Sequence, residues 1–132
     1  METHSTSLTA LLKAQKNFEA YRQNLDTDQN KAGAIQAFEY SFELAWKGMK
    51  RIIEDSNGKP IFGMKEIFRT AALAGLIDEP EIWFVFLEQR NLTSHTYDEE
   101  VAEEIIEIFP RFSVELEAFI NKATKRIQNA SH

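Results

Sequence analysis

Apolar side chains recur at the helical repeat from about Gln29 to Asp55, which limits the possible folds to those that can bury one long helix. One face of this predicted helix carries Ile35, Phe38, Phe42, Ala45, Trp46, Met49, Ile52 and Ile53. A face this broad has to pack against other helices or a sheet. Tyr40 and Leu44 stand roughly on the opposite face. They are either scattered exposed residues or part of a second surface that another subunit covers.

The segment before this helix repeats the same spacing. It is expected to begin among residues 5–7, Ser-Thr-Ser, which are good helix caps. The polar run at residues 26–30 should end it and supply the cap of the second helix. The second helix should stop at Gly58, ahead of Pro60. The apolar stripe of the first helix consists of Leu8, Leu11, Leu12, Gln15, Phe18 and Leu25.

Two further helices are predicted in the middle of the chain. A short one runs over about residues 63–74 and should end at Gly75, a natural C-terminal cap. The next one begins near Asp78, which we expect to cap it, with Pro80 in the first turn. The last turn of this helix carries Arg90.

The last predicted helix runs over about residues 97–128. Thr96 should cap it, with Glu99 reaching back to complete a capping box. Pro110 should kink it, because a proline leaves the carbonyl one turn earlier without a donor. His95, the one histidine away from the chain ends, then falls in the junction between two helices.

No segment alternates apolar and polar residues as a half-buried strand does. We therefore predict an all-α fold, an antiparallel four-helix up-and-down bundle with one extra short helix. The length of 132 residues suits a single domain, residues 1–132, whose core needs no disulfide. The chain has no cysteine, which excludes thiolate metal sites and a cysteine nucleophile.

Hydropathy and charge give further expectations. No apolar run approaches the ~20 residues that cross a bilayer, and the first residues lack the features of a signal peptide. We expect a cytoplasmic protein without membrane contact. The net charge is −6, but residues 47–69 hold six basic and three acidic residues, and residues 98–117 hold eight acidic and one basic. These runs are either solvated helix faces or working surfaces, a positive wall near Arg90 and an acidic face for a basic partner.

Residues 90–97, Arg-Asn-Leu-Thr-Ser-His-Thr-Tyr, concentrate the polar chemistry of the chain. Arg90 can fix a phosphate with a planar fork of donors, and His95 can move a proton near neutral pH. Positions five apart on an unbroken helix point about 140° apart, so a break at residues 94–95 is needed for both to face one cleft. The alternative is an ordinary helix end, where Arg90 binds carbonyls or a glutamate, His95 caps a turn and Tyr97 packs.

Residues 90–97 resemble the R-x(4–6)-H motif of HEPN proteins, in the form that ends in H-x-Y. Residues 38–47, Phe-Glu-Tyr-Ser-Phe-Glu-Leu-Ala-Trp-Lys, resemble the second-helix signature of one branch, the nucleotidyltransferase substrate-binding proteins. Residues 74–78, Ala-Gly-Leu-Ile-Asp, followed by Trp83, resemble that branch as well. The resemblance covers about residues 8 to 125, with its blocks in the right order.

The resemblance implies a dimeric four-helix bundle that forms a complex with a small nucleotidyltransferase encoded beside it. It also implies that Arg90 and His95 are catalytic in those members that are metal-independent ribonucleases. In such toxin–antitoxin pairs the nucleotidyltransferase neutralises the ribonuclease, in some by adenylylating the tyrosine at the position of Tyr97. Asn91 matches the polar position after the arginine, and Ser94 is a second supporting residue. No cofactor and no metal ion is implied.

Two functions follow from these observations. In the first, the chain is a ribonuclease toxin that the nucleotidyltransferase holds silent, with His95 taking the proton of a ribose 2′-OH and Arg90 stabilising the phosphoryl charge. In the second, it is a substrate-binding or docking subunit without nuclease activity, which holds a nucleotide or RNA. A helical interaction module without chemistry is the remaining alternative.

Overall fold

The computed structural model describes residues 2–130, and of the side chains those of residues 8–129. This part of the chain is almost entirely helical and holds no strand. None of its helices combines the length and the continuous apolar surface needed to cross a membrane. The elements in order are α1 (Glu2–Arg22), α2 (Asp28–Asn57), α3 (Met64–Leu73), α4 (Pro80–Asn91), a 3₁₀ helix η1 (Leu92–His95), α5 (Glu99–Glu107) and α6 (Phe109–Ala130).

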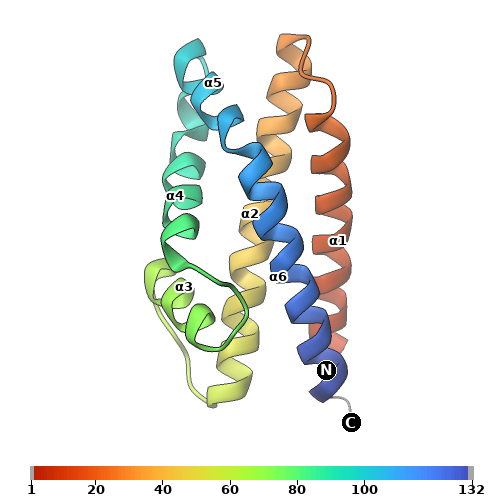
Figure 1. Cartoon of the computed structure of the whole chain (residues 1–132), viewed down its shortest axis with the longest axis vertical. Helices are drawn as coiled ribbons and strands as arrows, with labels where there is room; N and C mark the ends of the chain where they lie inside the picture. The colour runs from red at the N-terminus through yellow and green to blue at the C-terminus, as the bar shows by residue number, and fades with distance from the viewer. Residues whose placement is uncertain (1, 131–132) are drawn as a thin grey trace.

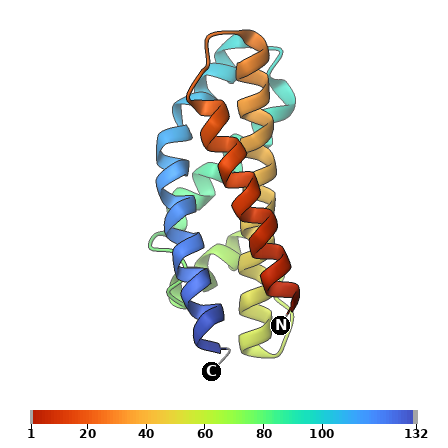
Figure 2. The ribbon, with the colours of Figure 1, turned by 90° about the vertical axis from the view of Figure 1, so that its right-hand side faces the viewer.

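The helices form an up-and-down bundle (Figure 1). The chain ascends in α1, descends in α2, ascends in α4 and descends through α5 and α6, so that both ends of the chain lie at the same end of the bundle. The short α3 lies beside α4 at that end, and α1 runs alongside α2 in both views (Figure 2). The prediction of an all-α bundle with one extra short helix is confirmed.

The core is built mainly from aromatic rings. The Phe18 ring meets that of Phe109 edge-on with 5.0 Å between centroids, and Phe86 meets Phe112 in the same way at 5.1 Å. Edge-to-face pairs add about 0.5–1.5 kcal/mol each to the gain from burial alone. Trp83 is fully buried among the rings of three other helices. The largest fully buried side chains are Trp83, Phe18, Phe38, Phe42, Phe68, Phe86, Phe109, Phe112, Phe119, Leu11, Met49 and Ile53.

Both ends of α2 are capped as the sequence indicates. The Thr27 hydroxyl accepts a hydrogen bond from the backbone N–H of Asn30 at 3.0 Å. Gly58 adopts φ 73°, a left-handed conformation that favours glycine, and its N–H donates to the Glu54 carbonyl at 2.8 Å. On the back of the helix, Tyr40 is exposed, whereas Leu44 is half-buried against the core and therefore does not belong to a free second face.

The loop between α2 and α3 is tied to the end of α2 by Glu54. Its carboxylate accepts hydrogen bonds from Lys50 Nζ at 2.6 Å and from the backbone N–H of Ile61 at 3.0 Å. The Lys50 hydrogen bond lowers the pKa of Glu54, and the Ile61 N–H adds to that effect. Ile61 packs against the core, and Phe62 beside it is 78% exposed.

The first helix differs from its prediction. It begins at Glu2 instead of among residues 5–7, and it ends at Arg22, so Leu25 packs on the core from outside the helix. Leu12, expected on the apolar stripe, is 46% exposed. The reason is that Leu11, one position earlier and fully buried, sets the centre of the buried face, and each step turns a helix by about 100°.

The start of α4 also corrects the sequence interpretation. Pro80 occupies the first turn as predicted, but Glu79 and not Asp78 is the cap residue, and it makes no side-chain hydrogen bond to the helix. Asp78 is drawn away because its carboxylate accepts a hydrogen bond from Lys122 of α6. A contact between distant helices has replaced a local cap.

The predicted final helix is in fact two helices. Asp98 and not Thr96 caps α5, because the Asp98 carboxylate accepts from the backbone N–H of Glu100 at 2.9 Å. Pro110 ends the continuity of the helix and does not merely kink it. It lies in the first turn of α6, where a missing N–H costs nothing, and α5 stops at Glu107.

Candidate functional site

The residues of the 90–97 motif occupy the end of α4 and the turn that follows it. The last α-helical turn tightens into the 3₁₀ helix η1, a common ending for helices. The Thr93 hydroxyl donates to the Arg90 carbonyl at 2.7 Å, and the Asp98 N–H donates to the His95 carbonyl at 3.1 Å. These two hydrogen bonds fix the backbone of the segment that carries Arg90, His95 and Tyr97.

Arg90 is held from three sides by α2 and α3. Its Nη1 lies 3.4 Å from Oε1 of Glu43, and its Nη2 lies 3.7 Å from the Met64 sulfur. Its guanidinium carbon lies 5.6 Å from the centre of the Phe42 ring, within the range of a cation–π contact. The side chain is 22% exposed, so the cation is pinned at the edge of the core with part of its donor set open.

Glu43 is itself fixed. The Trp46 indole N–H donates to Oε2 of Glu43 at 3.0 Å, which leaves Oε1 for Arg90. A continuous chain therefore runs from Trp46 through Glu43 to Arg90. Nε of Arg90 is buried and has no hydrogen-bond partner among the described residues. A buried polar atom without a partner is uncommon, and Trp83 Nε1 and Ser41 Oγ share this state in the described part of the chain.

The roles of Glu43, Trp46 and Met64 are absent from the sequence interpretation. The sequence places Glu43 only beside the apolar face of the second helix, and Trp46 and Met64 only among core residues. The sequence does indicate that Glu43 and Trp46 can contact each other, since they stand three positions apart and so share a helix face. It does not indicate the contact of Glu43 with Arg90, because that contact depends on how α4 packs against α2 and α3.

His95 and Tyr97 are exposed and lie outside the group of side chains that surrounds Arg90. The Tyr97 hydroxyl lies 3.4 Å from Nδ1 of His95, and the two rings meet at 72° with 5.9 Å between centroids. Tyr97 is 84% exposed. Within residues 8–129 no hydrogen bond or ion pair joins His95 to Arg90 in one protomer, so their convergence on one cleft stays a prediction. Asn91 and Ser94 are exposed in the same segment.

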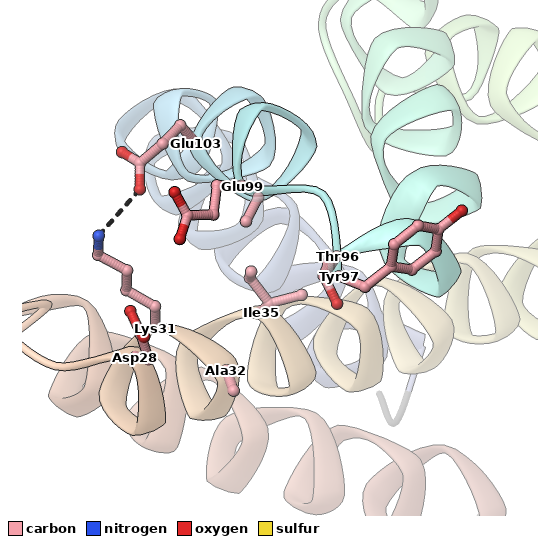
Figure 3. Close-up of a pocket in the computed structure, with 9 residues that line it drawn as sticks. Asp28, Lys31, Ala32, Ile35, Thr96, Tyr97, Glu99 and Glu103 are labelled. Carbon is pink, nitrogen blue, oxygen red and sulfur yellow. Dashed lines mark hydrogen bonds and ion pairs between the residues drawn. The ribbon is translucent and has the colours of Figure 1, made fainter.

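A hollow of about 350 Å³ opens between α2 and α5, next to the motif (Figure 3). Thr96 and Tyr97 line one end of the hollow, and Figure 3 shows the Tyr97 ring pointing away from Lys31. At the other end Lys31 and Glu103 form an ion pair of 3.0 Å, and this hydrogen bond raises the pKa of Lys31. Asp28, Glu99 and Glu103 supply three carboxylates against the one ammonium. The hollow is therefore unsuited to a phosphate.

The acidic side chains gather on α5 but form no metal site in the described part of the chain. Among the described residues, no group of three or more histidine, aspartate or glutamate side chains is arranged to hold a metal ion. Glu103 and Glu104 are exposed on α5, where Glu104 accepts a hydrogen bond from Gln89 of α4 at 3.0 Å. The face that α5 presents is strongly negative.

Two solved structures share this fold. A Thermus thermophilus protein, ttk003001694, superposes with a TM-score of 0.79 at 27% identity, covering 86% of this chain and 98% of that one. Haemophilus influenzae HI0074 superposes with a TM-score of 0.72 at 28% identity, covering 93% of this chain and 98% of that one. HI0074 is described as revealing the fold of a substrate binding domain of a nucleotidyltransferase.

Sequence comparison gives the same relationship. The chain is 31% identical over 129 residues to a Haemophilus influenzae protein named "Probable ribonuclease HepT", covering 95% of this chain and 88% of that protein. Residues 3–125 match the family model described as "Nucleotidyltransferase substrate binding protein like". The match spans nearly the whole bundle and confirms the resemblance seen in the motif blocks: the chain belongs to the nucleotidyltransferase substrate-binding family of HEPN-like helical proteins.

Proposed function

We propose that this chain is a metal-independent ribonuclease that a small nucleotidyltransferase holds silent in a two-gene toxin–antitoxin pair in the cytoplasm. One observation carries the proposal. A partly exposed arginine, held in place by Glu43, is followed five residues later by an exposed histidine. The similarity to a protein named as a probable ribonuclease supports the same chemistry.

The reaction needs one base, one acid and a cation. Neutral His95 takes the proton of a ribose 2′-OH, and the oxygen attacks the adjacent phosphorus. The bond from phosphorus to the 5′ oxygen breaks, a 2′,3′-cyclic phosphate remains, and the departing oxygen takes up a proton. Arg90 stabilises the charge that develops on the phosphoryl oxygens. His95 and Arg90 of one copy supply the base and the cation, so the proton for the departing oxygen has to come from a separate acid.

A homodimer would supply the missing acid. Within residues 8–129, whose side chains the structure describes, His95 is the one histidine, and we infer that the second imidazole comes from another copy. Two motif segments at one interface would bring two Arg90–His95 pairs together, with one histidine as base and the other as acid. The exposed position of His95 at the end of η1 supports such a shared centre.

The proposal assigns Tyr97 to regulation by the nucleotidyltransferase. Its hydroxyl is exposed and lies beside His95, so its oxygen could attack the α-phosphorus of ATP and release pyrophosphate. The resulting adenylyl group would place bulk and negative charge next to the base. Tyr97→Phe should remove the adduct seen by mass spectrometry after co-expression with an active partner. An adduct that persists in the variant would place the modification elsewhere.

The decisive experiment is cleavage of RNA by protein expressed without the partner. We expect cleavage that resists EDTA, and a loss of at least ~10²-fold on His95→Ala, the lower end of what positioned proton transfer contributes. Arg90→Ala should lose a comparable amount. Cleavage by His95→Ala at the wild-type rate would show that a contaminating nuclease cuts the RNA. Absence of both cleavage and growth inhibition by partner-free wild type would overturn the ribonuclease proposal.

The second candidate is a docking subunit without nuclease activity. It is favoured by the description of HI0074 as a substrate binding domain and by the acidic face of α5, which suits a basic partner surface. Charge reversal at Glu103 and Glu104 should slow association with the nucleotidyltransferase encoded nearby and weaken its salt dependence. Failure of the two proteins to co-purify would reject the pairing in both candidates.

A further inference from the structure

We propose that Lys47 of α2 and Lys65 of α3, on either side of Arg90, bind phosphates of single-stranded RNA and guide the strand across the arginine. The inference deepens the proposed function and rests on it, since it names the surface by which the same site holds its substrate. It is carried by two of the three contacts that hold Arg90, those to Glu43 and Met64, because Lys47 lies one helical turn from Glu43 and Lys65 directly follows Met64.

On the α2 side, Lys47 follows the residues that hold Arg90. Glu43, which pairs with Arg90, stands four positions before Lys47, so the two side chains share one face of the helix. Lys47 Nζ lies 5.8 Å from the centre of the Trp46 ring, and the indole is anchored to Glu43. The lysine is exposed. An ammonium group thus stands over a half-buried aromatic ring, one helical turn from the glutamate that holds the arginine.

On the α3 side, Lys65 directly follows Met64, whose sulfur contacts Arg90. Lys65 Nζ lies 5.7 Å and the Arg69 guanidinium carbon 5.4 Å from the centre of the Phe84 ring on α4. Phe84 precedes Arg90 by six residues, about 9 Å along the helix axis. Six residues also turn the helix by about 240°, so Lys65 and Arg69 lie beside a different face of α4 from Arg90. Met64, which precedes Lys65 in the chain, connects them to the arginine.

These two lysines are available to an anion. Within the described residues no carboxylate lies at ion-pair distance from Lys47 or Lys65. Their basic neighbours are engaged, since Lys50 pairs with Glu54 at 2.6 Å and Arg69 approaches Glu66 at 3.9 Å. Lys47 and Lys65 differ from the exposed lysines of α1 and α6 by their position beside Glu43 and Met64, the residues that contact Arg90.

The chemistry of the surface favours single-stranded RNA over other anions. Cations spaced across α2, α3 and α4 match a repeating backbone charge rather than one phosphate. The 78% exposed Phe62, two residues before Met64, offers an aromatic surface that suits stacking by an unpaired base. The hollow beside α5 carries three carboxylates and would repel the strand, which directs it toward α2 and α3.

The test measures RNA binding separately from cleavage. Full-length His95→Ala protein is titrated into a fluorescein-labelled single-stranded oligoribonucleotide, with anisotropy recorded at several salt concentrations. Lys47→Ala and Lys65→Ala are introduced one at a time into this His95→Ala protein. Lys13→Ala and Lys125→Ala are the matched controls, because Lys13 and Lys125 are exposed lysines on α1 and α6. Losing one phosphate contact should lower the slope of log affinity against log salt by about 0.7.

We expect each of the two lysine variants to lower affinity and slope, and the double variant to lower the slope by about 1.4, while the controls bind like the parent. RNA binding that is unaffected by Lys47→Ala and Lys65→Ala, or equally affected by the controls, would overturn the inference. Absence of RNA binding would overturn it too. If lysine-dependent binding is found but partner-free wild type cleaves no RNA, the inference stands as a binding surface and the ribonuclease proposal fails.

Discussion

At the scale of single residues, Glu43 decides what Arg90 can do. An arginine that is only 22% exposed needs a counter-charge, because a desolvated cation without one is costly. Glu43 meets that need with one oxygen while Trp46 orients the other. The guanidinium is therefore held in one position, as the proposed stabilisation of a phosphoryl charge requires.

The first prediction concerns this chain of contacts. Glu43→Gln keeps the shape but removes the charge, so Arg90 should become less well positioned and kcat for RNA cleavage should fall about tenfold, or ~1.4 kcal/mol. KM should change less than kcat. Glu39→Gln, an exposed site one turn earlier on α2, is the matched control. An unchanged kcat in Glu43→Gln would show that the charge of Glu43 is not needed to position Arg90 for cleavage.

The second prediction concerns a buried hydroxyl on the same helix. Ser41 is fully buried, and its Oγ has no hydrogen-bond partner among the described residues. Ser41→Ala removes an unsatisfied polar group and should raise the free energy of unfolding by about 1 kcal/mol. Ala45→Ser, one turn later and equally buried, should lower it by about 1–3 kcal/mol. Urea denaturation measures both. Destabilisation by Ser41→Ala would mean that the hydroxyl has a partner.

The motif residues could be named from the sequence, but their environment could not. Arg90, His95 and Tyr97 stand within one short segment, so a local pattern is enough to single them out. Glu43 and Met64 come from other helices, and their contacts depend on helix packing. The sequence allows Arg90 to pair with a glutamate, but it does not identify Glu43 as that residue.

At the scale of elements, the local sequence predicts a helix cap correctly where no residue distant in the chain binds the capping side chain. Thr27 and Gly58 cap α2 as expected. Asp78 was a plausible cap for α4, but Lys122 of α6 engages its carboxylate. Thr96 was a plausible cap for α5, but the 3₁₀ turn carries the chain two residues further, to Asp98. Pro110 signals an interruption, and only the structure distinguishes a break from a kink.

The third prediction uses two glycines of opposite character at α2. Gly58→Ala forces a Cβ into a left-handed conformation at φ 73° and should lower the free energy of unfolding by about 1 kcal/mol. Gly48 is helical, and an added Cβ would lie 3.7 Å from the Phe119 ring, an ordinary contact. Gly48→Ala should therefore raise stability by up to about 1 kcal/mol. Thermal and urea unfolding test both, and the same sign for both would contradict the capping argument.

At the scale of the whole molecule, the bundle could be predicted because its evidence is distributed over the chain. Helical periodicity and buried aromatic residues recur along the main helices, so errors at single caps did not change the fold class. Assembly is different, because a surface seen in one protomer does not name what covers it. The best guide is Val85 of α4, a partly exposed apolar side chain that does not pack against the core cluster.

The fourth prediction is that the protein is a homodimer that buries more than ~1,000 Å² in total, with α4 in the interface. Val85 of α4 is half-buried and lies outside the core cluster, so it is free to contact another copy. Val85→Lys should shift the protein to monomer in sedimentation equilibrium at micromolar concentration, because an unpaired cation is costly in an apolar interface. Val114→Lys, at a 61% exposed site on α6, should leave the dimer intact.

The same pair of variants connects assembly to chemistry. If two His95 side chains share one centre, the Val85→Lys monomer should lose RNA cleavage along with dimerisation, whereas Val114→Lys should retain both. Circular dichroism would confirm that each variant keeps its helical content. A wild type that sediments as a monomer would contradict the dimer, and a Val85→Lys monomer that cleaves RNA at the wild-type rate would show that one protomer holds a complete active site.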